Sequence, residues 1–347
     1  MKAVGIVAEY NPFHTGHFSH LERSKEISGT NMIIVVMSGN FVQRGEPACM
    51  DKWRRTKTAL ENGADMVIEL PLSIATASAG YFAQGAVNLL KKTGIVDCMC
   101  FGSECGDINM LEQYANALSS EDQNFKNRLK LHLGMGLSYP AARAKAAMLD
   151  LPDTPNDVLG VEYIKSLKEL KSNIVPLTVL RSPGSAMEVR ACMKKRGDDF
   201  ACLDNLSNIF HYVLHTNKNL HSILDVSEGL ENRLKKCAKS NKLISEIIES
   251  AKTKRYTYLR LQRAALHMIL GITSVQEPQY IRVLGFRKKS ENLLGMLEER
   301  ASLPIVMNIK NAKFPMLDEE IQSTKIYSLA FNKHMHIDEY VMPLIVV

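Results

Sequence analysis

The sequence contains no hydrophobic run long enough to cross a membrane. Hydrophobic residues make up 46% of its 347 positions and charged residues 23%, which are ordinary proportions for a globular chain. None of its apolar stretches approaches the roughly 18 uncharged residues that a membrane helix requires. The first expected strand begins at residue 4, which leaves no space for a signal peptide. We therefore expect a cytoplasmic protein with no membrane partner.

The cysteines lack the pattern that metal sites and disulfide frameworks require. There are seven of them, an odd number, and none forms a Cys-x-x-Cys pair. Scattered thiols of this kind are typical of a reducing compartment. We expect reduced cysteines and no metal ligands among the protein side chains.

Two common nucleotide-binding fingerprints are also missing. No Gly-x-Gly-x-x-Gly follows the first apolar run, and no Gly-Lys-Ser/Thr phosphate loop occurs anywhere in the chain. A nicotinamide-dependent dehydrogenase and a P-loop ATPase are therefore both disfavoured.

Strand-like and helix-like stretches alternate through the first half of the chain. The expected strands are residues 4–8, 31–37, 65–70, 95–101 and 174–180, and the expected helices are residues 17–28, 52–62, 75–92 and 158–171. This alternation predicts a parallel sheet covered by helices. Ligands of such sheets bind beyond the carboxyl ends of the strands. Polar clusters fall at those ends, in residues 9–17, 38–40 and 102–104 and at Arg181.

The polar cluster after the first strand carries the strongest functional signal. Residues 9–17 read Glu-Tyr-Asn-Pro-Phe-His-Thr-Gly-His. The Asn-Pro step predicts a turn, and the helix that follows begins with free N–H groups that attract anions. His14 and His17 would then each donate a hydrogen bond to a phosphate oxygen. Two ordinary turn histidines are the alternative. The preceding strand and turn favour a site in which the histidines bind a nucleoside triphosphate at its α-phosphate.

This arrangement of strand, turn, His-Thr-Gly-His and helix resembles the HxGH-type adenylyltransferases, relatives of the class I aminoacyl-tRNA synthetases. Residues 184–190, Gly-Ser-Ala-Met-Glu-Val-Arg, fit their second signature loosely. Six further phrases, at residues 37–47, 63–71, 101–104, 137–140, 155–163 and 280–286, are similar to one family, the bacterial tRNA(Met) cytidine acetate ligases. The chain departs from that family in having Asn-Asp at residues 156–157 and a short connection at residues 182–184.

The resemblance implies a Rossmann-like (HUP-type) nucleotidyltransferase domain over residues 1–200 and a mainly α-helical domain over residues 201–347. It implies an enzyme that makes acetyl-adenylate from ATP and acetate and passes the acetyl group to N4 of the wobble cytidine of elongator tRNA(Met). Mg²⁺ would accompany the pyrophosphate, with few protein ligands. The implied catalytic residues are His14, His17, Arg181 and Arg190, the last by contact with the β- and γ-phosphates. The implied ATP contacts are Val7, Ala8, Glu9, Tyr10, Asn11, Pro12, Phe13, His14, Thr15, Gly16, His17, Phe18, Ser19, His20, Gly102, Asn156 and Arg181.

The second half of the chain is helical in pattern and locally basic. Between residues 233 and 263 lie ten Lys or Arg, at positions 233, 235, 236, 239, 242, 252, 254, 255, 260 and 263, against two acids. Such a cluster favours a polyanion, and aromatic side chains between basic ones can stack RNA bases. A solvated helix face with inward-packed tyrosines is the alternative. We expect tRNA to contact Lys254, Arg255, Tyr258, Arg260 and Arg263.

Two rival functions stay open at this point. A small-molecule nucleotidyltransferase that adenylates a phosphorylated vitamin precursor would share the first half but needs no basic helical half. A nucleotide- and tRNA-binding protein without catalysis is favoured by the short connection after Arg181. The base that accepts the proton during acetyl transfer is also open: Glu9, Asp51 and Glu104 qualify by residue type, and structural roles are more common for such carboxylates. The sequence does not give an oligomeric state.

Overall fold

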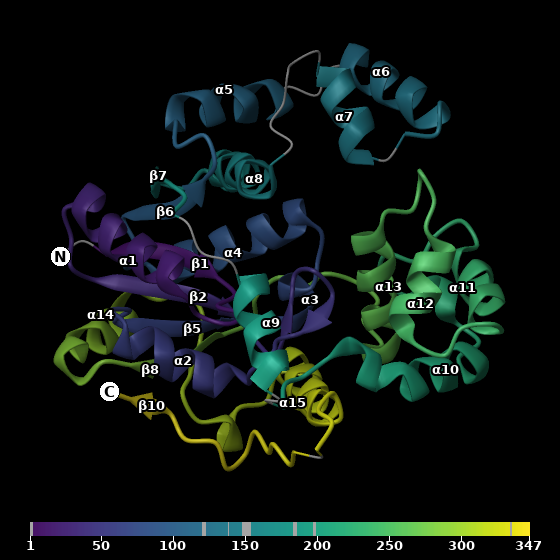
Figure 1. Cartoon of the computed structure of the whole chain (residues 1–347). Coiled ribbons are helices and arrows are strands. Elements are labelled where there is room, and N and C mark those ends of the chain that lie inside the picture. The colour runs from purple at the N-terminus through teal and green to yellow at the C-terminus, as the bar shows by residue number, and fades with distance from the viewer. Residues whose placement is uncertain are drawn as a thin grey trace.

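The chain folds around one mostly parallel sheet (Figure 1). The computed structural model describes residues 3–119, 123–137, 139–147, 154–182, 186–196, 199–333 and 335–347. Within these residues the main sheet has eight strands. Seven follow the order β10 (Ile345–Val346), β8 (Ile281–Phe286), β5 (Met66–Leu70), β2 (Ile33–Ser38), β1 (Val4–Ala8), β6 (Cys98–Ser103) and β7 (Val175–Leu180), and β9 (Ile305–Val306) pairs with β8.

The five strands expected from the sequence form the centre of this sheet. They are β1 (Val4–Ala8), β2 (Ile33–Ser38), β5 (Met66–Leu70), β6 (Cys98–Ser103) and β7 (Val175–Leu180). Each neighbouring pair among them is parallel. The predicted Rossmann-like sheet is therefore confirmed, and its polar strand ends meet at one edge.

Helices cover both faces of the sheet. The helices α1 (Thr15–Ser28) and α2 (Lys52–Glu61) lie on one face, and α4 (Ala79–Thr93) and α8 (Pro155–Glu169) lie on the other (Figure 1). In β2, Ile33 and Val35 pack into the core under the first pair, whereas Ile34 and Val36 pack into the core under the second. Successive strand residues point to opposite faces, so an unbroken apolar run is buried on both sides.

Shorter elements complete this half of the molecule. The expected helix over residues 75–92 begins instead at Ala79, as α4. It follows the short helix α3 (Leu72–Ala75) and a turn at residues 76–78, where the Thr76 hydroxyl donates back to the Leu72 carbonyl. The remaining elements are the hairpin strands β3 (Phe41–Val42) and β4 (Glu46–Pro47) and the helices α5 (Ile108–Ser119), α6 (Gln123–Gly134), α7 (Tyr139–Ala147) and α9 (Ala186–Arg196).

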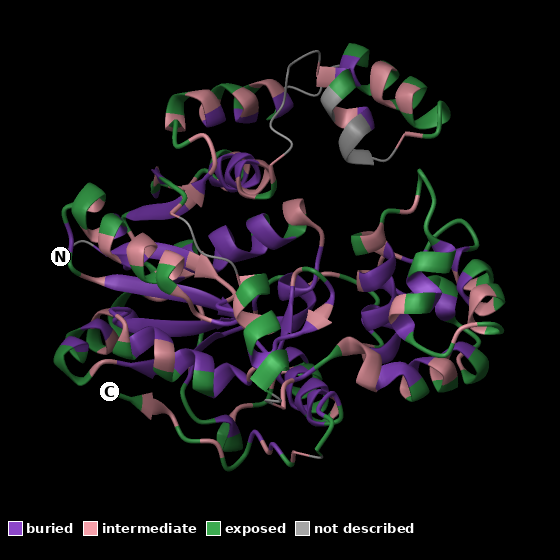
Figure 2. Cartoon of the chain, viewed as in Figure 1, coloured by how far each residue is buried: buried purple, intermediate pink, exposed green. Residues whose placement is uncertain are grey.

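A separate helical cluster follows. It contains α10 (Ser207–Thr216), α11 (Leu230–Ala238), α12 (Ile244–Ala251) and α13 (Tyr258–Leu270), with 3₁₀ turns at Leu203–Leu206 and Leu220–Ser222. Its buried leucines and isoleucines form a second core, which Phe41, Trp53 and Leu72 extend into the sheet half. Figure 2 shows the buried residues of these helices on the faces that point toward one another.

The expected division at residue 200 into a sheet domain and a helical domain needs a correction. Strand β8 (Ile281–Phe286) lies antiparallel to β5, and β9 (Ile305–Val306) and β10 (Ile345–Val346) pair with β8. The chain thus returns to the main sheet after the helical cluster, with α14 (Asn292–Arg300), α15 (Pro315–Ser328) and 3₁₀ turns at Lys288–Ser290 and Ile309–Asn311. All six residues of β8 are buried. Its short apolar run has no local feature that specifies a partner more than 200 residues away.

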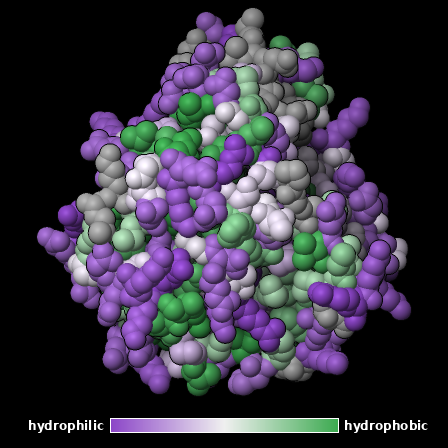
Figure 3. Space-filling view, turned by 60° about the vertical axis from the view of Figure 1, so that its left-hand side comes forward, coloured by the Kyte–Doolittle hydropathy of each residue, from purple (hydrophilic) through white to green (hydrophobic). Residues whose placement is uncertain are grey.

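One face of the molecule is mainly hydrophilic. Figure 3 shows charged and polar side chains over most of one face, with separate apolar patches between them. Within the described ranges, no helix has the length and apolar character needed to span a membrane.

Candidate active site at the carboxyl ends of the strands

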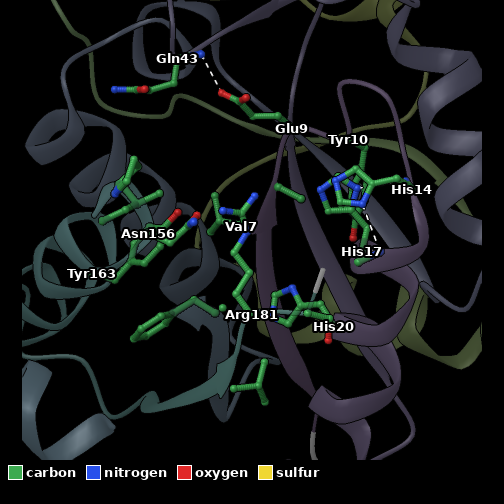
Figure 4. A pocket seen from close by; sticks show the side chains of 18 of the residues that line it. Val7, Glu9, Tyr10, His14, His17, His20, Gln43, Asn156, Tyr163 and Arg181 are labelled. Carbon is green, nitrogen blue, oxygen red and sulfur yellow. Dashed lines mark hydrogen bonds between the residues drawn. The ribbon is translucent and has the colours of Figure 1, made fainter. Parts of the chain in front are cut away.

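A cavity lies where the sequence analysis places ligands. It has a volume of about 520 Å³, within the usual range of about 300–1,000 Å³ for small-molecule sites. Its walls come from the end of β1, the start of α1, the ends of β6 and β7 and the start of α8 (Figure 4). The cavity therefore spans the carboxyl ends of three neighbouring parallel strands.

The two motif histidines form the cap of α1 at the cavity wall. His14 is the N-cap residue, and its Nδ1 accepts a hydrogen bond from the backbone N–H of Gly16 at 3.1 Å. The Nδ1 of His17 accepts from the backbone N–H of His14 at 3.3 Å. A neutral imidazole has one donor and one acceptor nitrogen, so both rings carry their proton on Nε2. The cap leaves two Nε2–H donors at a helix N-terminus, which is a favourable place for an anion.

Both rings are held neutral. Burial lowers the pKa of His14, and the nearby Arg181 lowers it further. Burial, with smaller effects from His14, His20 and Arg181, lowers the pKa of His17 to about 3. The two rings stack with their centroids 3.7 Å apart. Two positive charges at that separation would repel, so the stack and the pKa shifts agree.

A third imidazole lines the same wall. His20 lies one helical turn beyond His17, and burial lowers its pKa to about 4. Its Nε2 is buried and has no hydrogen-bond partner in the part of the chain that the structure describes. The cavity therefore offers this group an unfilled polar contact for a ligand.

Arg181 supplies positive charge across from the histidines. It follows β7, its side chain is 51% exposed, and its Nη1 lies 3.4 Å from Glu104 Oε1. The same oxygen accepts from the Asn156 side chain at 2.5 Å, and Glu104 Oε2 accepts from the Asp157 backbone N–H at 3.1 Å. Glu104 thus holds Arg181 and the start of α8 together. Figure 4 shows Arg181 pointing into the cavity between Asn156 and the histidines.

Asp157, one of the departures from the resembling family, has a structural role. Its Oδ1 accepts from the backbone N–H groups of Glu104 and Cys105 at 2.9 and 3.2 Å, and its Oδ2 accepts from the Thr154 hydroxyl at 2.6 Å. The carboxylate is buried and closes the turn after β6. The turn keeps Glu104 in place beside Arg181.

Glu9 occupies the wall next to the β3–β4 hairpin. Its Oε1 accepts from the backbone N–H of Gln43 at 2.9 Å. Burial raises the pKa of the Glu9 carboxyl, and the neighbouring Glu46 adds to the rise, while the Gln43 bond and the guanidinium groups of Arg44 and Arg55 oppose it. Glu9 therefore holds its proton more tightly than an exposed carboxyl group does.

Arg55 fixes the backbone on which Glu9 sits. Its guanidinium is fully buried and donates to the carbonyl oxygens of Glu9 at 2.7 Å and Ser38 at 3.0 Å, and also to that of Gly39. Its Nε donates to the Met50 carbonyl at 2.9 Å. These bonds tie the end of β1 to the end of β2.

Gly102 leaves open space where a side chain would stand. A Cβ at this position would meet no heavy atom within 4 Å, and the residue lines the cavity. By contrast, a Cβ on Gly5 of β1 would lie 2.8 Å from Leu90. The missing side chain at Gly102 therefore enlarges the ligand space.

The structure brings most of the expected ATP contacts to the cavity, although no ligand is there to test them. The residues that line it are Val7, Ala8, Glu9, Tyr10, His14, Gly16, His17, His20, Gly102, Asn156 and Arg181. Six expected contacts lie outside its wall: Asn11, Pro12, Phe13, Thr15, Phe18 and Ser19. Asn11 instead accepts from the Cys49 backbone N–H, and the Ser19 hydroxyl bonds that of Ser182 at 2.8 Å.

Arg190 is placed beside the motif turn rather than on the cavity wall. Its Nη1 donates to the Asn11 carbonyl oxygen at 2.6 Å. Its expected contact with the β- and γ-phosphates stays a prediction. The expected loop and signature around it fall partly at residues 183–185, which lie outside the described residues.

Several lining residues were not foreseen. They are Arg23, Gln43, Arg44, Phe82, Phe101, Pro155, Leu159, Tyr163, Val179, Leu180, Ser182 and Leu259. Gln43 and Arg44 belong to the family-like phrase at residues 37–47, but that phrase did not indicate what either side chain does. Leu259 has no signal in the sequence, because only the packing of α13 against the hairpin brings it to the cavity.

The expected tRNA contacts lie around the start of α13. Lys254 and Arg255 are exposed, and Arg255 pairs with Glu228. Arg260 donates to the Ser227 hydroxyl and lies over the Tyr256 ring, 5.2 Å from its centroid.

The other two expected contacts have packing roles. Tyr258 is half-buried against the helical core. Arg263 is only 12% exposed and forms a salt bridge with Asp225 at 3.1 Å, so it supports the fold more than it faces solvent.

Comparison with known proteins finds relatives over nearly the whole chain. A family model described as HIGH Nucleotidyl Transferase matches residues 1–191 and 182–340. The tRNA(Met) cytidine acetate ligase of Acetivibrio thermocellus is 39% identical, over 95% of this chain and 95% of that protein. The enzyme of the same name from Caldanaerobacter subterraneus subsp. tengcongensis is 37% identical, over 95% and 96%. The crystal structure of Thermotoga maritima TmcAL bound with alpha-thio ATP matches with a TM-score of 0.91 at 33% identity, over 100% of this chain and 99% of that one.

Proposed function

The chain belongs to the HIGH nucleotidyltransferase family and, within it, to the tRNA(Met) cytidine acetate ligases, and on this premise we propose how its site performs the reaction. It is an ATP-dependent ligase. We propose that it activates acetate as acetyl-adenylate and transfers the acetyl group to N4 of the wobble cytidine of elongator tRNA(Met). Such a substrate is in keeping with the cytoplasmic location that the sequence predicts.

The observation that carries this proposal is the fixed orientation of the two Nε2–H groups. In the first step an acetate oxygen attacks the α-phosphorus, and the bond to the pyrophosphate oxygen breaks. His14 and His17 donate to the α-phosphate oxygens as the phosphorus becomes five-coordinate. Because the helix cap holds both rings before ATP arrives, little reorganisation opposes the reaction.

Positive charge and the helix end complete the phosphate site. Arg181 offsets the negative charge that the triphosphate brings, and the guanidinium fork suits phosphate oxygens. Arg190 holds the Asn11 carbonyl with one N–H group, and its other N–H groups are the proposed donors to the β- and γ-phosphates. Mg²⁺ would enter as part of the substrate, MgATP.

The tRNA approaches from the helical cluster in this proposal. Leu259 of α13 is 42% exposed and lines the cavity, while its neighbours in sequence are Tyr258 and Arg260. A strand of RNA held by the exposed cations near the start of α13 would therefore lie at the mouth of the cavity. Single-stranded loops are the part of RNA whose bases can be turned into such a site.

A reconstitution experiment tests the proposal. The purified protein is incubated with MgATP, labelled acetate and methionine tRNA, and the nucleosides are analysed by mass spectrometry. Acetylcytidine in the tRNA supports the proposal. Adenylation of a pantetheine- or mononucleotide-like phosphate would support the small-molecule rival, and ATP and tRNA binding without turnover would support the non-catalytic rival.

A further inference from the structure

Glu9 is the one carboxylate at the cavity wall whose position the phosphate chemistry does not explain. His14, His17 and Arg181 present donors and positive charge, which suit a triphosphate. A carboxylate beside them would repel the same phosphates. Figure 4 shows Glu9 next to Gln43, on a different part of the wall from the paired histidines. Its place fits a ligand group that brings hydrogen-bond donors.

The carboxylate of Glu9 is fixed by one of its oxygens, and the other oxygen is left without a partner in the described part of the chain. Oε1 accepts from the Gln43 backbone N–H at 2.9 Å, which fixes the side chain in one orientation. Oε2 has no hydrogen-bond partner, and the carboxylate has no salt bridge, among the described residues. The buried Arg55 uses its donors on backbone carbonyls. One acceptor atom therefore remains available at the cavity.

Glu9 is hydrogen-bonded to the β3–β4 hairpin, and this hairpin packs against α13 of the proposed tRNA surface. Gln43 and Arg44 of the hairpin and Leu259 of α13 also line the cavity. The hairpin and α13 are in direct contact: a Cβ on Gly45 would lie 2.6 Å from the Arg263 backbone nitrogen. A base that enters from α13 passes these residues before it reaches the phosphate site.

We propose that Glu9 is the catalytic base of the transfer step, an inference that rests on the proposed function. Oε2 accepts a hydrogen bond from the N4 amino group of the incoming cytidine. The N4 lone pair attacks the acetyl carbonyl carbon, the bond from that carbon to the phosphate oxygen breaks, and AMP leaves with its electron pair. N4 then loses one proton to Oε2. The products are N4-acetylcytidine, AMP and a protonated Glu9, which releases its proton to solvent.

The chemistry needs such a group in the second step and not in the first. Acetate is already an anion and attacks without losing a proton. The cytidine amino group is a weak nucleophile that becomes acidic only as the new bond forms. A base is most effective when its pKa approaches the working pH, and burial raises the pKa of Glu9 in that direction.

The experiment separates the two half-reactions in Glu9→Gln. The amide oxygen of glutamine can still accept from Gln43, so the wall is preserved while the base is removed. Acetate-dependent exchange between ATP and pyrophosphate reports the first step. Mixing the acetyl-adenylate-loaded enzyme with tRNA(Met) in a single turnover reports the second. We expect transfer slower by about 10² to 10⁴-fold, the usual contribution of a general base, with a much smaller effect on exchange.

Control variants keep the outcome interpretable. Glu9→Asp should recover part of the transfer rate, because it restores a base at a shorter reach. Glu26→Gln changes an exposed carboxylate of α1 outside the cavity lining and should leave transfer within a few-fold of wild type. Transfer by Glu9→Gln at the wild-type rate would overturn the inference, as would equal loss of both half-reactions with an unchanged melting temperature. Failure of the wild-type enzyme to acetylate tRNA would instead overturn the proposed function.

Discussion

The imidazole rings of His14 and His17 lie stacked with their centroids 3.7 Å apart, and each ring nitrogen Nδ1 accepts a backbone N–H at the start of α1. The helix cap and the anion site are therefore one structure. The same hydrogen bonds that begin the helix decide which nitrogen of each ring can donate to a ligand.

Replacing His17 should abolish activation while sparing RNA binding. His17→Ala removes one preorganised donor to the α-phosphate, which costs on the order of 3 kcal/mol of transition-state stabilisation, or at least about 10²-fold in rate. Acetate-dependent pyrophosphate exchange measures the loss, and tRNA affinity by filter binding should stay nearly unchanged. His215→Ala, on the exposed face of α10, is the control. Unchanged exchange in His17→Ala would contradict the role assigned to the pair.

Filling the space beside Gly102 should weaken ATP binding without disturbing the fold. Gly102→Val places methyl groups where no protein atom lies within 4 Å of the Cβ position. The strand can therefore accommodate the valine side chain, whereas that side chain would occupy space that ATP needs. We expect the KM for ATP to rise about tenfold or more, equivalent to about 1.4 kcal/mol, and Gly102→Ala to have a smaller effect. Thermal unfolding should be unchanged in both. Gly295→Ala, also free of neighbours within 4 Å but in α14, should leave the KM for ATP unaltered.

The buried histidines should make the fold sensitive to mild acid. Burial lowers the pKa of His17 to about 3 and that of His20 to about 4, whereas both titrate near 6.5 in the unfolded chain. Below pH 6.5 the unfolded state therefore binds more protons, so the free energy of unfolding falls as pH falls toward these values. At pH 5 each group lowers it by about 2 kcal/mol relative to its value above pH 7.

Urea unfolding of His20→Asn at pH 5 and pH 7 measures this effect. We expect the variant to lose about 2 kcal/mol of the difference between the two pH values, whereas His215→Asn should keep all of it. An equal acid sensitivity in wild type and His20→Asn would show that the cavity histidine is not responsible.

Reversing charge at the start of α13 should weaken tRNA binding and flatten its salt dependence. Changing Lys254, Arg255 and Arg260 to Glu removes the expected phosphate contacts. Each lost contact lowers the slope of log affinity against log salt by about 0.7 to 0.9. Pyrophosphate exchange should continue. Arg263 is left unchanged because its salt bridge with Asp225 supports the fold.

A matched charge reversal provides the comparison. Lys57, Lys310 and Lys313 are exposed and lie on α2 and in the segment before α15, so the triple change to Glu alters net charge equally. If both triple variants lose tRNA affinity to the same extent, the effect is one of overall charge, and the binding surface is not at α13.

The sequence by itself determined the elements whose cause is local. Runs such as Ile33–Ser38 are apolar and rich in β-branched residues, which favours buried strands. The Asn-Pro turn followed by His14 and His17 indicates where the next helix begins. Parallel strands then bring their carboxyl ends together by geometry, so the ligand edge followed from the order of elements alone.

Only the tertiary structure decided the features that depend on distant partners. Nothing near Ile281 or Phe286 specifies pairing with β5, so the return of the chain to the sheet was missed. Leu259 and Gln43 reach the cavity because the hairpin packs against α13, and Arg263 turns inward because Asp225 lies beside it. Local sequence fixes backbone periodicity and caps, whereas the neighbours of a side chain are set by packing across the whole chain.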